Sequence, residues 1–449
     1  MSGSRVFRFI GILIAIVAVA GIAVLAFYAT RPGPMAFASG KPVALGAYEG
    51  HPTGVPADFS STDAIARGRY LTQAADCQAC HTTEGGTPFA GGRAFKFPFG
   101  TMYSPNITPD ANTGIGQWTD AEFLKAMHDG IGRGGKKLYP AFPYAAYTYV
   151  TDDDVLAIKA YLFSLTPVVS TARANDLVFP FNQRSLMTVW SGLFNPGRRF
   201  EPRAEQTAAW NRGAYLAEGL AHCGECHTPR NLMQALDNSD KFAGALTGGW
   251  RAYNITGDQA SGVGAWSEAD IGSYLAQGHA AGRGTASGPM AEAVDISFSN
   301  MTPTDIAAIV TYVRSVPARE SNDLPAPRTI VASADPKEST VATVDVRGQQ
   351  VFAGACASCH GWTGVSPLST RATLTGTRAV NDPRATNVAQ VVLHGSGAMS
   401  AVGTLAMPGF GASYNDDEVA AVANYVTGRF GVQASALTAD DVRKLRALE

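Results

Sequence analysis

Residues 77–81 read CQACH, and the pattern Cys-x-x-Cys-His returns as CGECH at 223–227 and as CASCH at 356–360. All 6 cysteines of the 449-residue chain belong to these three copies, so no thiol is left over. A zinc site needs four ligands around one ion, whereas these pairs lie in separate parts of the chain. A thioredoxin-type redox pair does not require the histidine. The pattern instead predicts covalent attachment of haem c, in which two thiols add to the haem and the histidine ligates iron.

The motif therefore predicts three covalently bound haem c groups in one chain. The predicted attachment residues are Cys77, Cys80, Cys223, Cys226, Cys356 and Cys359. The predicted proximal iron ligands are His81, His227 and His360.

Composition narrows the class of protein further. The formal net charge of -2 and the charged fraction of 16% provide no basic surface for nucleic acid. Glycine (48 residues) and proline (25 residues) are abundant, and few alternating β-branched runs are bounded by turns. We therefore expect an all-α fold with long ordered loops, and the length suggests about three domains.

The first two motifs lie in a duplicated unit. RGRYL at 67–71 returns as RGAYL at 212–216, shortly before the cysteines. After the cysteines, NITPD at 106–110 and GIGQW at 114–118 return 148 residues later as NITGD and GVGAW. The third unit keeps an Arg-Gly pair at 347–348 but lacks the later landmarks, and it is shorter.

Each unit also ends in a predicted helix with an acidic residue seven positions before a tyrosine. The pairs are Asp154 with Tyr161, Asp305 with Tyr312, and Glu418 with Tyr425. In the first of these helices, Val155, Ile158 and Leu162 form one apolar stripe, which predicts a face packed on a core. We expect each unit to contain an opening helix, the CxxCH motif, a long loop and a closing helix.

These landmarks divide the chain into predicted parts. Haem-binding domains are expected at 50–165, 204–316 and 341–431. The remaining parts are a membrane anchor at 1–35, an aromatic-rich connector at 166–203, a linker at 317–340 and a C-terminal tail helix at 432–449.

The connector at 166–203 contains Phe179, Phe181, Trp190 and Phe194, which are too many aromatic residues for a solvated tether. Two interpretations stay open. The aromatic side chains pack between neighbouring units, or they form a docking surface for another subunit.

The N-terminal stretch predicts one transmembrane helix. Arg5 and Arg8 precede a run without charges from Phe9 to Thr30, which is long enough to span a hydrocarbon core of roughly 30 Å. The alternative is a signal peptide cleaved after AFA at 36–38, but the apolar run is longer than such segments require. The basic residues predict a cytoplasmic N-terminus with the rest of the chain outside, which in a bacterium is the periplasm.

Two methionines are the predicted distal iron ligands. Met290 lies 22 residues before Tyr312, Met407 lies 18 residues before Tyr425, and each is adjacent to a proline that stiffens its loop. A thioether opposite histidine raises the potential of a c-type haem. Met301 and Met399 are the alternatives in the same two units.

The first unit has Phe142 in the corresponding window, 19 residues before Tyr161. Its phenyl ring cannot ligate iron. Met127 and Met102 are out of position, and His128 is the remaining candidate, although its surroundings favour a helix surface. The first haem is therefore expected to be either five-coordinate, with Phe142 over the iron, or ligated from an unusual place.

Basic residues supply another set of candidates. Arg93, Lys96 and Arg251 follow glycine pairs between a CxxCH motif and the NIT landmark, where a cation could meet a haem propionate or remain solvated. The sequence shows no catalytic triad, phosphate loop or paired-carboxylate motif.

Longer stretches carry a family resemblance. With YSPNITPD, GIGQWTDAEF, LYPAFPY and NDLVFPFNQRSLMTVW beside the three motifs, the chain resembles the three-haem cytochrome c subunits of membrane-bound bacterial dehydrogenases. Those enzymes oxidise alcohols, gluconate, fructose or aldehydes at the periplasmic face. The resemblance implies three all-α cytochrome c domains in tandem, which carry electrons from a separate catalytic subunit to ubiquinone.

One departure from the family pattern bears on the partner. Alcohol- and gluconate-type members usually read PAMPY where this chain reads PAFPY at 140–144. PAFPY resembles the cytochromes that accompany molybdopterin hydroxylases, including membrane-bound aldehyde dehydrogenases. The resemblance therefore implies a catalytic partner with molybdopterin and iron-sulfur centres rather than a quinone cofactor or a flavin.

The sequence as a whole predicts an electron-transfer subunit of an oxidoreductase complex rather than its substrate-oxidising subunit. The expected location is the bacterial inner membrane, crossed once, with the haem domains in the periplasm. The alternative function is a haem enzyme in its own right, resembling a peroxidase, which would use an open site on the first haem.

Overall fold

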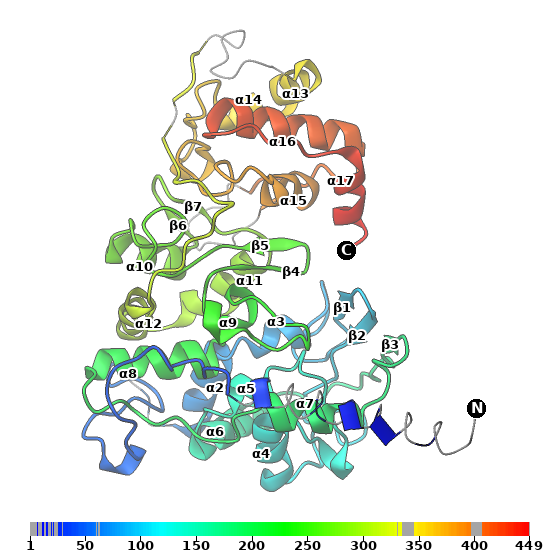
Figure 1. Ribbon diagram of the computed structural model, residues 1–449, viewed down its shortest axis with the longest axis vertical. Helices are drawn as coiled ribbons and strands as arrows, with labels where there is room; N and C mark the ends of the chain where they lie inside the picture. The colour runs from blue at the N-terminus through cyan, green and yellow to red at the C-terminus, as the bar shows by residue number, and fades with distance from the viewer. Residues whose placement is uncertain are drawn as a thin grey trace.

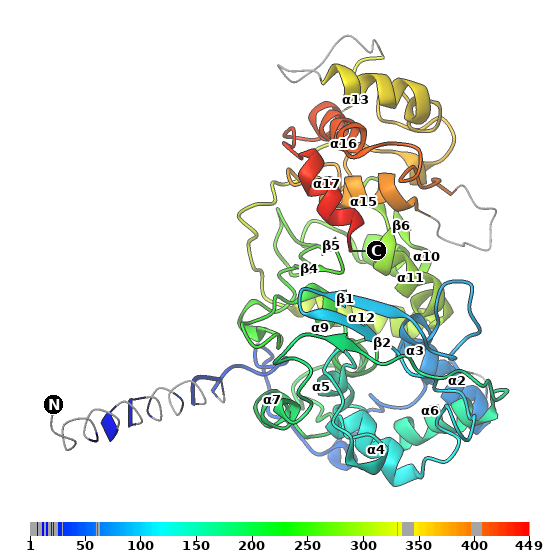
Figure 2. The same cartoon turned by 90° about the vertical axis from the view of Figure 1, so that its right-hand side faces the viewer.

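The computed structural model describes residues 30–59, 61, 63–329, 331–334, 345–396 and 406–448, together with residues 7, 11, 12, 15, 16, 19, 21 and 26–28. Its elements form an elongated stack (Figure 1). The helices of the first unit lie at one end, those of the third unit lie at the other, and the second unit lies between them in both views (Figure 2).

Helices dominate each unit. The first contains α2 (Ala64–Ala74), α3 (Cys77–His81), α4 (Asp120–Asp129), α5 (Tyr144–Tyr147) and α6 (Asp152–Ser164), and the connector contains α7 (Leu186–Phe194). The second contains α8 (Ala208–Tyr215), α9 (Gly224–His227), α10 (Glu268–Gln277), α11 (Gly288–Ile296) and α12 (Pro303–Ser315). The third contains α13 (Val346–Val351), α14 (Ala357–His360), α15 (Thr386–His394) and α16 (Asp416–Phe430), followed by α17 (Ala439–Arg446).

The glycine of each recurring Arg-Gly pair lies where the opening helix crosses the closing helix. A Cβ added to Gly68, Gly213 or Gly348 would lie 1.9, 2.0 or 2.1 Å from a carbonyl oxygen of the closing helix. No side chain larger than hydrogen fits at that distance, so the close crossing requires glycine. The predicted apolar stripe of α6 is confirmed, because Val155 and Ile158 are fully buried.

The first two units hold each other through two equivalent hydrogen bonds. Tyr70 of α2 donates its hydroxyl to Asp305 of α12 at 2.6 Å, and Tyr215 of α8 donates to Asp154 of α6 at 2.5 Å. Since the two tyrosines occupy equivalent positions, as do the two aspartates, the opening helix of each unit contacts the closing helix of the other. The third unit has an exposed glutamine, Gln350, at the tyrosine position.

The hydrophobic cores follow the same division. One cluster of buried side chains runs through the first two units, from Leu71 and Ile158 to Tyr215 and Tyr312. A second cluster, which includes Phe352 and Phe430, fills the third unit. The proposed domain boundaries remain predictions, but the shared core indicates that the first two units are packed as one body.

The expectation of an all-α fold is wrong, because short antiparallel sheets accompany the helices. The strands are β1 (Ala94–Phe97), β2 (Gly100–Tyr103) and β3 (Asp176–Leu177) in one sheet, β4 (Ala245–Thr247) with β5 (Trp250–Ala252), and β6 (His279–Ala280) with β7 (Gly284–Thr285). Glycines with positive φ allow the chain to reverse at these points. Gly100, at φ +125, is the first residue of β2, and Gly248 and Gly249, at φ +56 and +78, form the turn between β4 and β5. The loop after each of the first two CxxCH motifs therefore folds back as a hairpin.

The prediction of a transmembrane helix is also corrected. Among the described residues, no helix is long and apolar enough to cross a membrane. Crossing takes roughly 20 residues, whereas α16 has 15 residues, most of them buried within the third unit. Most of the span from Phe9 to Thr30 lies outside the described residues. The expected single-pass anchoring in the inner membrane is therefore not supported.

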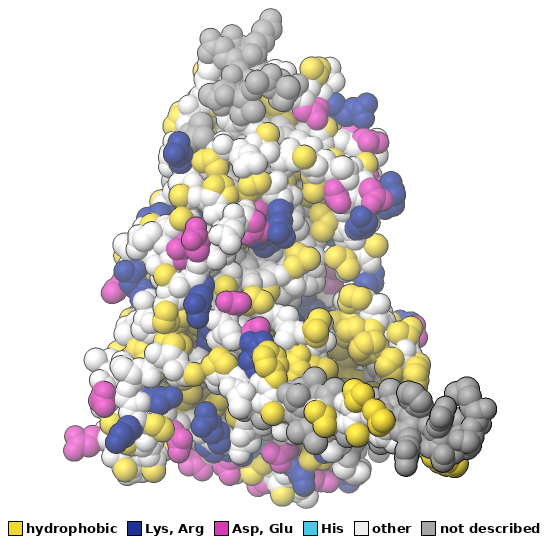
Figure 3. Space-filling model, in the orientation of Figure 1, with side chains coloured by type: hydrophobic (Ala, Val, Ile, Leu, Met, Phe, Trp, Pro, Cys, Tyr) yellow, Lys and Arg dark blue, Asp and Glu magenta, His cyan; other side chains and the backbone are white. Residues whose placement is uncertain are grey.

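The connector has one buried aromatic residue and several exposed apolar residues. Trp190 of α7 is buried against Tyr144, and its indole nitrogen donates to the carbonyl of Met233 at 2.8 Å. Phe179 is 77% exposed, and Val178, Phe181, Leu186 and Val189 are exposed beside it in the chain. Hydrophobic side chains gather on this part of the surface in Figure 3. The packing role is confirmed for Trp190, and the docking role stays a prediction.

The Arg212–Asp305 ion pair predicts a strong effect on stability. Arg212 donates to both carboxylate oxygens of Asp305 at 2.7 Å, and the Asp305 side chain is 0% exposed. The substitution Arg212→Met leaves a buried carboxylate without its cation, so we expect the free energy of unfolding to fall by about 3–5 kcal/mol. Urea unfolding measures this change. The control Lys444→Met removes an exposed ion pair with Asp440 and should unfold like the unsubstituted protein. Equal losses in the two variants would contradict this interpretation.

Candidate haem centres

One cavity of about 2590 Å³ is lined by the cysteines and histidines of all three CxxCH motifs. Ligand pockets commonly measure roughly 300–1,000 Å³, so this cavity has room for several large groups. Its other lining residues include many apolar and aromatic side chains, such as Ile115, Trp118, Phe298 and Phe410. A long apolar cavity with thiols and imidazoles on its wall suits haem c, because the porphyrin is largely apolar and needs covalent and axial attachment.

The three motif histidines are oriented in the same way. Each Nδ1 lies within hydrogen-bond distance of a backbone carbonyl, at 2.8 Å for His81, 2.7 Å for His227 and 2.6 Å for His360. A carbonyl can only accept, so Nδ1 carries the proton and Nε2 keeps a free lone pair for iron. Burial lowers the pKa of each of these histidines, which favours the neutral, ligating form.

The NIT landmark explains how those carbonyls are placed in the first two units. Pro105 and Tyr253 supply the carbonyls, and each is followed by the landmark asparagine. The side-chain oxygen of Asn106 accepts from the backbone N–H of Thr108 at 2.9 Å. In the same way, the side-chain oxygen of Asn254 accepts from the backbone N–H of Thr256 at 2.8 Å. This Asx turn aims the preceding carbonyl at the histidine. The repeat was visible in the sequence, but its role was not.

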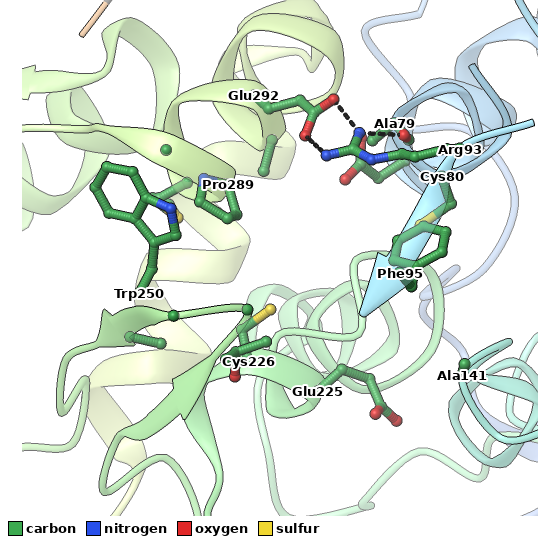
Figure 4. Close-up of a pocket in the computed structure, with 18 of the residues that line it drawn as sticks. Ala79, Cys80, Arg93, Phe95, Ala141, Glu225, Cys226, Trp250, Pro289 and Glu292 are labelled. Carbon is green, nitrogen blue, oxygen red and sulfur yellow. Dashed lines mark hydrogen bonds and ion pairs between the residues drawn. The ribbon is translucent and has the colours of Figure 1, made fainter. Parts of the chain in front are cut away.

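The six cysteines form no disulfide bonds with one another. Burial raises the pKa of Cys77, Cys80 and Cys223 to about 12, so these thiols stay protonated until they react. Figure 4 shows the side chains of Cys80 and Cys226, from different units, beside the same space. The donor set and the cavity therefore fit haem c, and the individual attachment residues remain predictions.

The distal loops of the first two units have the same construction. Gly130 ends α4 at φ +63, and Gly278 ends α10 at φ +68. In both units the residue eight positions later donates its backbone N–H to that glycine's carbonyl at 2.8 Å. Phe142 and Met290 each follow 12 residues after the glycine, and both line the cavity. Phe142 therefore occupies the place that Met290 occupies in the second unit.

The other methionines are separated by their positions. Met407 lines the cavity and pairs with Ser396 in an isolated antiparallel β-bridge. The alternative Met399 lies outside the described residues. Met301 is buried in the core and does not line the cavity. Met127 and Met102 are buried but do line the cavity, which the spacing argument did not predict.

Met127 is explained by its counterpart. It lies 148 residues before Leu275, which also lines the cavity and packs against the same core. A side chain that is leucine in the repeat serves packing, so Met127 is assigned to the wall of the first site rather than to iron.

Phe142 belongs to a chain of rings that joins the first two sites. Its ring centroid lies 5.4 Å from that of Tyr147, which lies 5.5 Å from the ring of His222. The Tyr147 hydroxyl donates to the carbonyl of Ala75 at 2.9 Å. Burial raises the pKa of Tyr147 well above its ordinary value, so it remains a neutral phenol. His222, directly before the second motif and outside any helix or strand, also lines the cavity.

His128 does not contribute to the cavity. Its side chain is 2% exposed within α4, and it is absent from the residues that line the cavity. Both the ligand role and the helix-surface position considered from the sequence are therefore wrong. Its Nδ1 lies 3.7 Å from Asp152, and its Nε2 has no partner among the described residues.

The three basic residues that were considered for propionate contact or solvation each reach a protein group. Arg93 forms a bidentate pair with Glu292 of α11, while Arg251 pairs with Asp323 at 2.7 Å and Asp382 at 3.0 Å. Among the described residues, Lys96 donates to the carbonyl of Ala447 at 3.4 Å. The acidic partners lie far away in the chain, and no local signal in the sequence points to them.

Two family models match the chain. The model described as "Cytochrome c" matches residues 65–166. The model described as "Cytochrome C oxidase, cbb3-type, subunit III" matches residues 345–426. These matches cover the first and third motifs and support haem c as the bound group.

Curated relatives extend the similarity across the chain. The gluconate 2-dehydrogenase cytochrome c subunit of Pantoea cypripedii is 38% identical over 414 residues, covering 87% of this chain and 91% of the relative. The fructose dehydrogenase cytochrome subunit of Gluconobacter japonicus is 38% identical over 407 residues, covering 85% and 82%. A nicotinate dehydrogenase subunit of Pseudomonas putida is 40% identical over 377 residues, covering 83% of this chain, which spans only 31% of that relative's length.

Replacing Phe142 tests whether this residue lies on the distal side of the first haem, where Met290 is expected in the second unit. Phe142→Met should convert one haem to methionine ligation and raise its potential, because the thioether favours ferrous iron. A redox titration followed by visible spectroscopy measures the change. The control Met127→Leu copies the second unit and should leave every potential unchanged. An unchanged potential in Phe142→Met would contradict the assignment.

His128 predicts a pH dependence of stability. Burial and the nearby Arg199 lower its pKa from 6.5 to about 4, so the unfolded chain binds the proton more tightly than the folded protein. Its contribution to stability is complete above pH 6.5 and is lost as the pH falls toward 4, by up to roughly 3 kcal/mol. Urea unfolding at several pH values should show a shallower loss for His128→Gln. The same slope in both proteins would exclude His128 as the cause.

Proposed function

Because the chain belongs to the family of cytochrome c subunits of dehydrogenases, we propose that it carries three haem c groups and passes electrons from a catalytic dehydrogenase subunit to ubiquinone. The single observation that carries this proposal is the continuous cavity lined by all three CxxCH motifs. Three redox groups within one cavity would lie close enough to pass electrons from one to the next.

The residues of the chain would prepare the cavity for electron transfer. Haem c supplies one-electron chemistry between ferric and ferrous iron when bound. The motif thiols would hold each group covalently, and the carbonyl bonds to Nδ1 keep the imidazoles from rotating. Met290 and Met407 would raise the potentials of two sites, while Phe142 would leave the first site different from both.

The proposed partner is a dehydrogenase with molybdopterin and iron-sulfur centres that oxidises aldehydes. Its support is the PAFPY loop at 140–144, whose Phe142 lines the cavity at the place equivalent to Met290. The similarity to a nicotinate dehydrogenase subunit supports a second substrate class, nitrogen heterocycles such as nicotinate. The substrate belongs to the partner, so identification of the copurifying subunit and its cofactor separates these classes.

A peroxidase-like activity is the second candidate. Phe142 in the distal slot favours it, because a ring that cannot ligate leaves one coordination position for a small oxidant. His128, the nearest histidine of the distal segment, is not a cavity residue and could not serve as its acid–base group. Peroxide turnover by the chain purified without its partner, together with failure to reduce a quinone analogue, would favour this candidate over the relay.

Removal of the second haem tests the relay. In the native assembly, the double substitution Cys223→Ala and Cys226→Ala should lower the covalent haem content from three to two per chain. Substrate-driven reduction of a quinone analogue should then be lost, because the second site lies between the other two. Dye reduction by the catalytic subunit should persist. The control Glu225→Gln changes a variable position of the same motif and should keep all three haems. Quinone reduction that survives loss of the second haem would contradict the relay.

A further inference from the structure

Helix α11 lies at the junction of the three units. It carries Met290 near its start and contacts α3 of the first unit, β5 of the second and α15 of the third. Gly288, at φ +53, lets the start of the helix lie against the ring of Trp250, and a Cβ there would be 2.4 Å from that ring. Any displacement of α11 would therefore alter both the Met290 position and the spacing of the first two sites.

Arg93 joins this helix to the first CxxCH motif. Its Nη2 donates to one carboxylate oxygen of Glu292 at 2.9 Å, and its Nη1 donates to the other carboxylate oxygen and to the carbonyl of Ala79 (Figure 4). Ala79 lies inside the first CxxCH motif, and Glu292 lies two residues after Met290. A planar guanidinium that forms a bidentate pair fixes orientation as well as distance. One side chain thus connects the attachment helix of the first haem to the distal-ligand helix of the second.

Arg251 makes a corresponding connection at the next junction. Arg251 lies in β5, in the hairpin that follows the second CxxCH motif. Arg93 lies directly before β1, in the hairpin that follows the first motif. Arg251 pairs with Asp382, whose side chain is 0% exposed, and its backbone exchanges hydrogen bonds with the Asn387 side chain of α15. Both inter-unit junctions therefore use an arginine from the segment that follows a CxxCH motif, and a carboxylate from the next unit.

We propose that Arg93 and Glu292 are positioning residues of the electron relay, which set the first haem against the helix that ligates the second. The inference rests on the proposed function. The transfer moves one electron from the reduced site to the oxidised site, with no bond broken and no proton moved, so its rate depends on the geometry that the pair maintains. Arg93 has both terminal nitrogens occupied by protein acceptors, which distinguishes this role from propionate binding.

The experiment uses the full chain with its catalytic partner. Glu292→Gln keeps the shape of the side chain but removes its charge and replaces one of the two oxygens that accept from Arg93 with an NH2 donor, and Arg93→Met removes the cation. Each should weaken the thioether-to-iron charge-transfer band of the ferric second haem, lower that haem's potential, and slow electron equilibration between the first two haems by about fivefold. Both should keep three covalent haems. The control Lys96→Met, in the same hairpin, should change none of these quantities.

A double-mutant cycle identifies the pair as the cause. The double variant Arg93→Met with Glu292→Gln should be no slower than either single variant, because all three lose the same contact. Losses that add, or single variants that match the unsubstituted protein in band and rate, would overturn the inference. The band reports Met290 ligation even where no quinone is reduced. Failure of the relay and failure of the positioning role are therefore distinguishable.

Discussion

The hydrogen bond from Nδ1 of each CxxCH histidine to a backbone carbonyl is the constraint on which the rest of each unit depends. The histidine belongs to a short helix, whereas the carbonyl lies 24, 26 or 12 residues later. The chain must therefore leave the motif, reverse and return to the imidazole. In the first two units a β-hairpin provides the reversal and an Asx turn aims the carbonyl. An unpaired Nδ1 in this apolar cavity would carry the cost of an unsatisfied buried donor.

A second constraint joins the units. The first two share a core and exchange tyrosine–aspartate bonds, so each opening helix is held by the closing helix of the other unit. The third has its own core and is attached mainly through polar contacts, with Arg251 and Asp382 among them. The cavity nevertheless continues across both junctions. The first two units thus form one packed body to which the third unit is added. The cysteines and histidines of all three motifs nevertheless line the same cavity.

The expectations that failed share a physical cause. Short strands such as β4 have no alternating pattern to detect, because they form where glycines allow a tight reversal rather than where side chains alternate. The ion pairs of Arg93 and Arg251 were not foreseen, because their carboxylate partners lie 199, 72 and 131 residues away. His128 lies in a polar-looking stretch but is buried by packing that no local window contains.

The sequence by itself determined the haem chemistry, because CxxCH places two thiols and an imidazole within one helical turn and requires no distant residue. It also indicated the equivalence of Phe142 and Met290, since these two residues are separated by the same 148 residues as the NIT and Trp landmarks of the first two units. Only the tertiary structure decided that the three motifs line one cavity, and that Arg93, which follows the first motif, pairs with Glu292 on the helix that carries Met290. Those relations depend on contacts between residues far apart in the chain, which local spacing and periodicity do not encode.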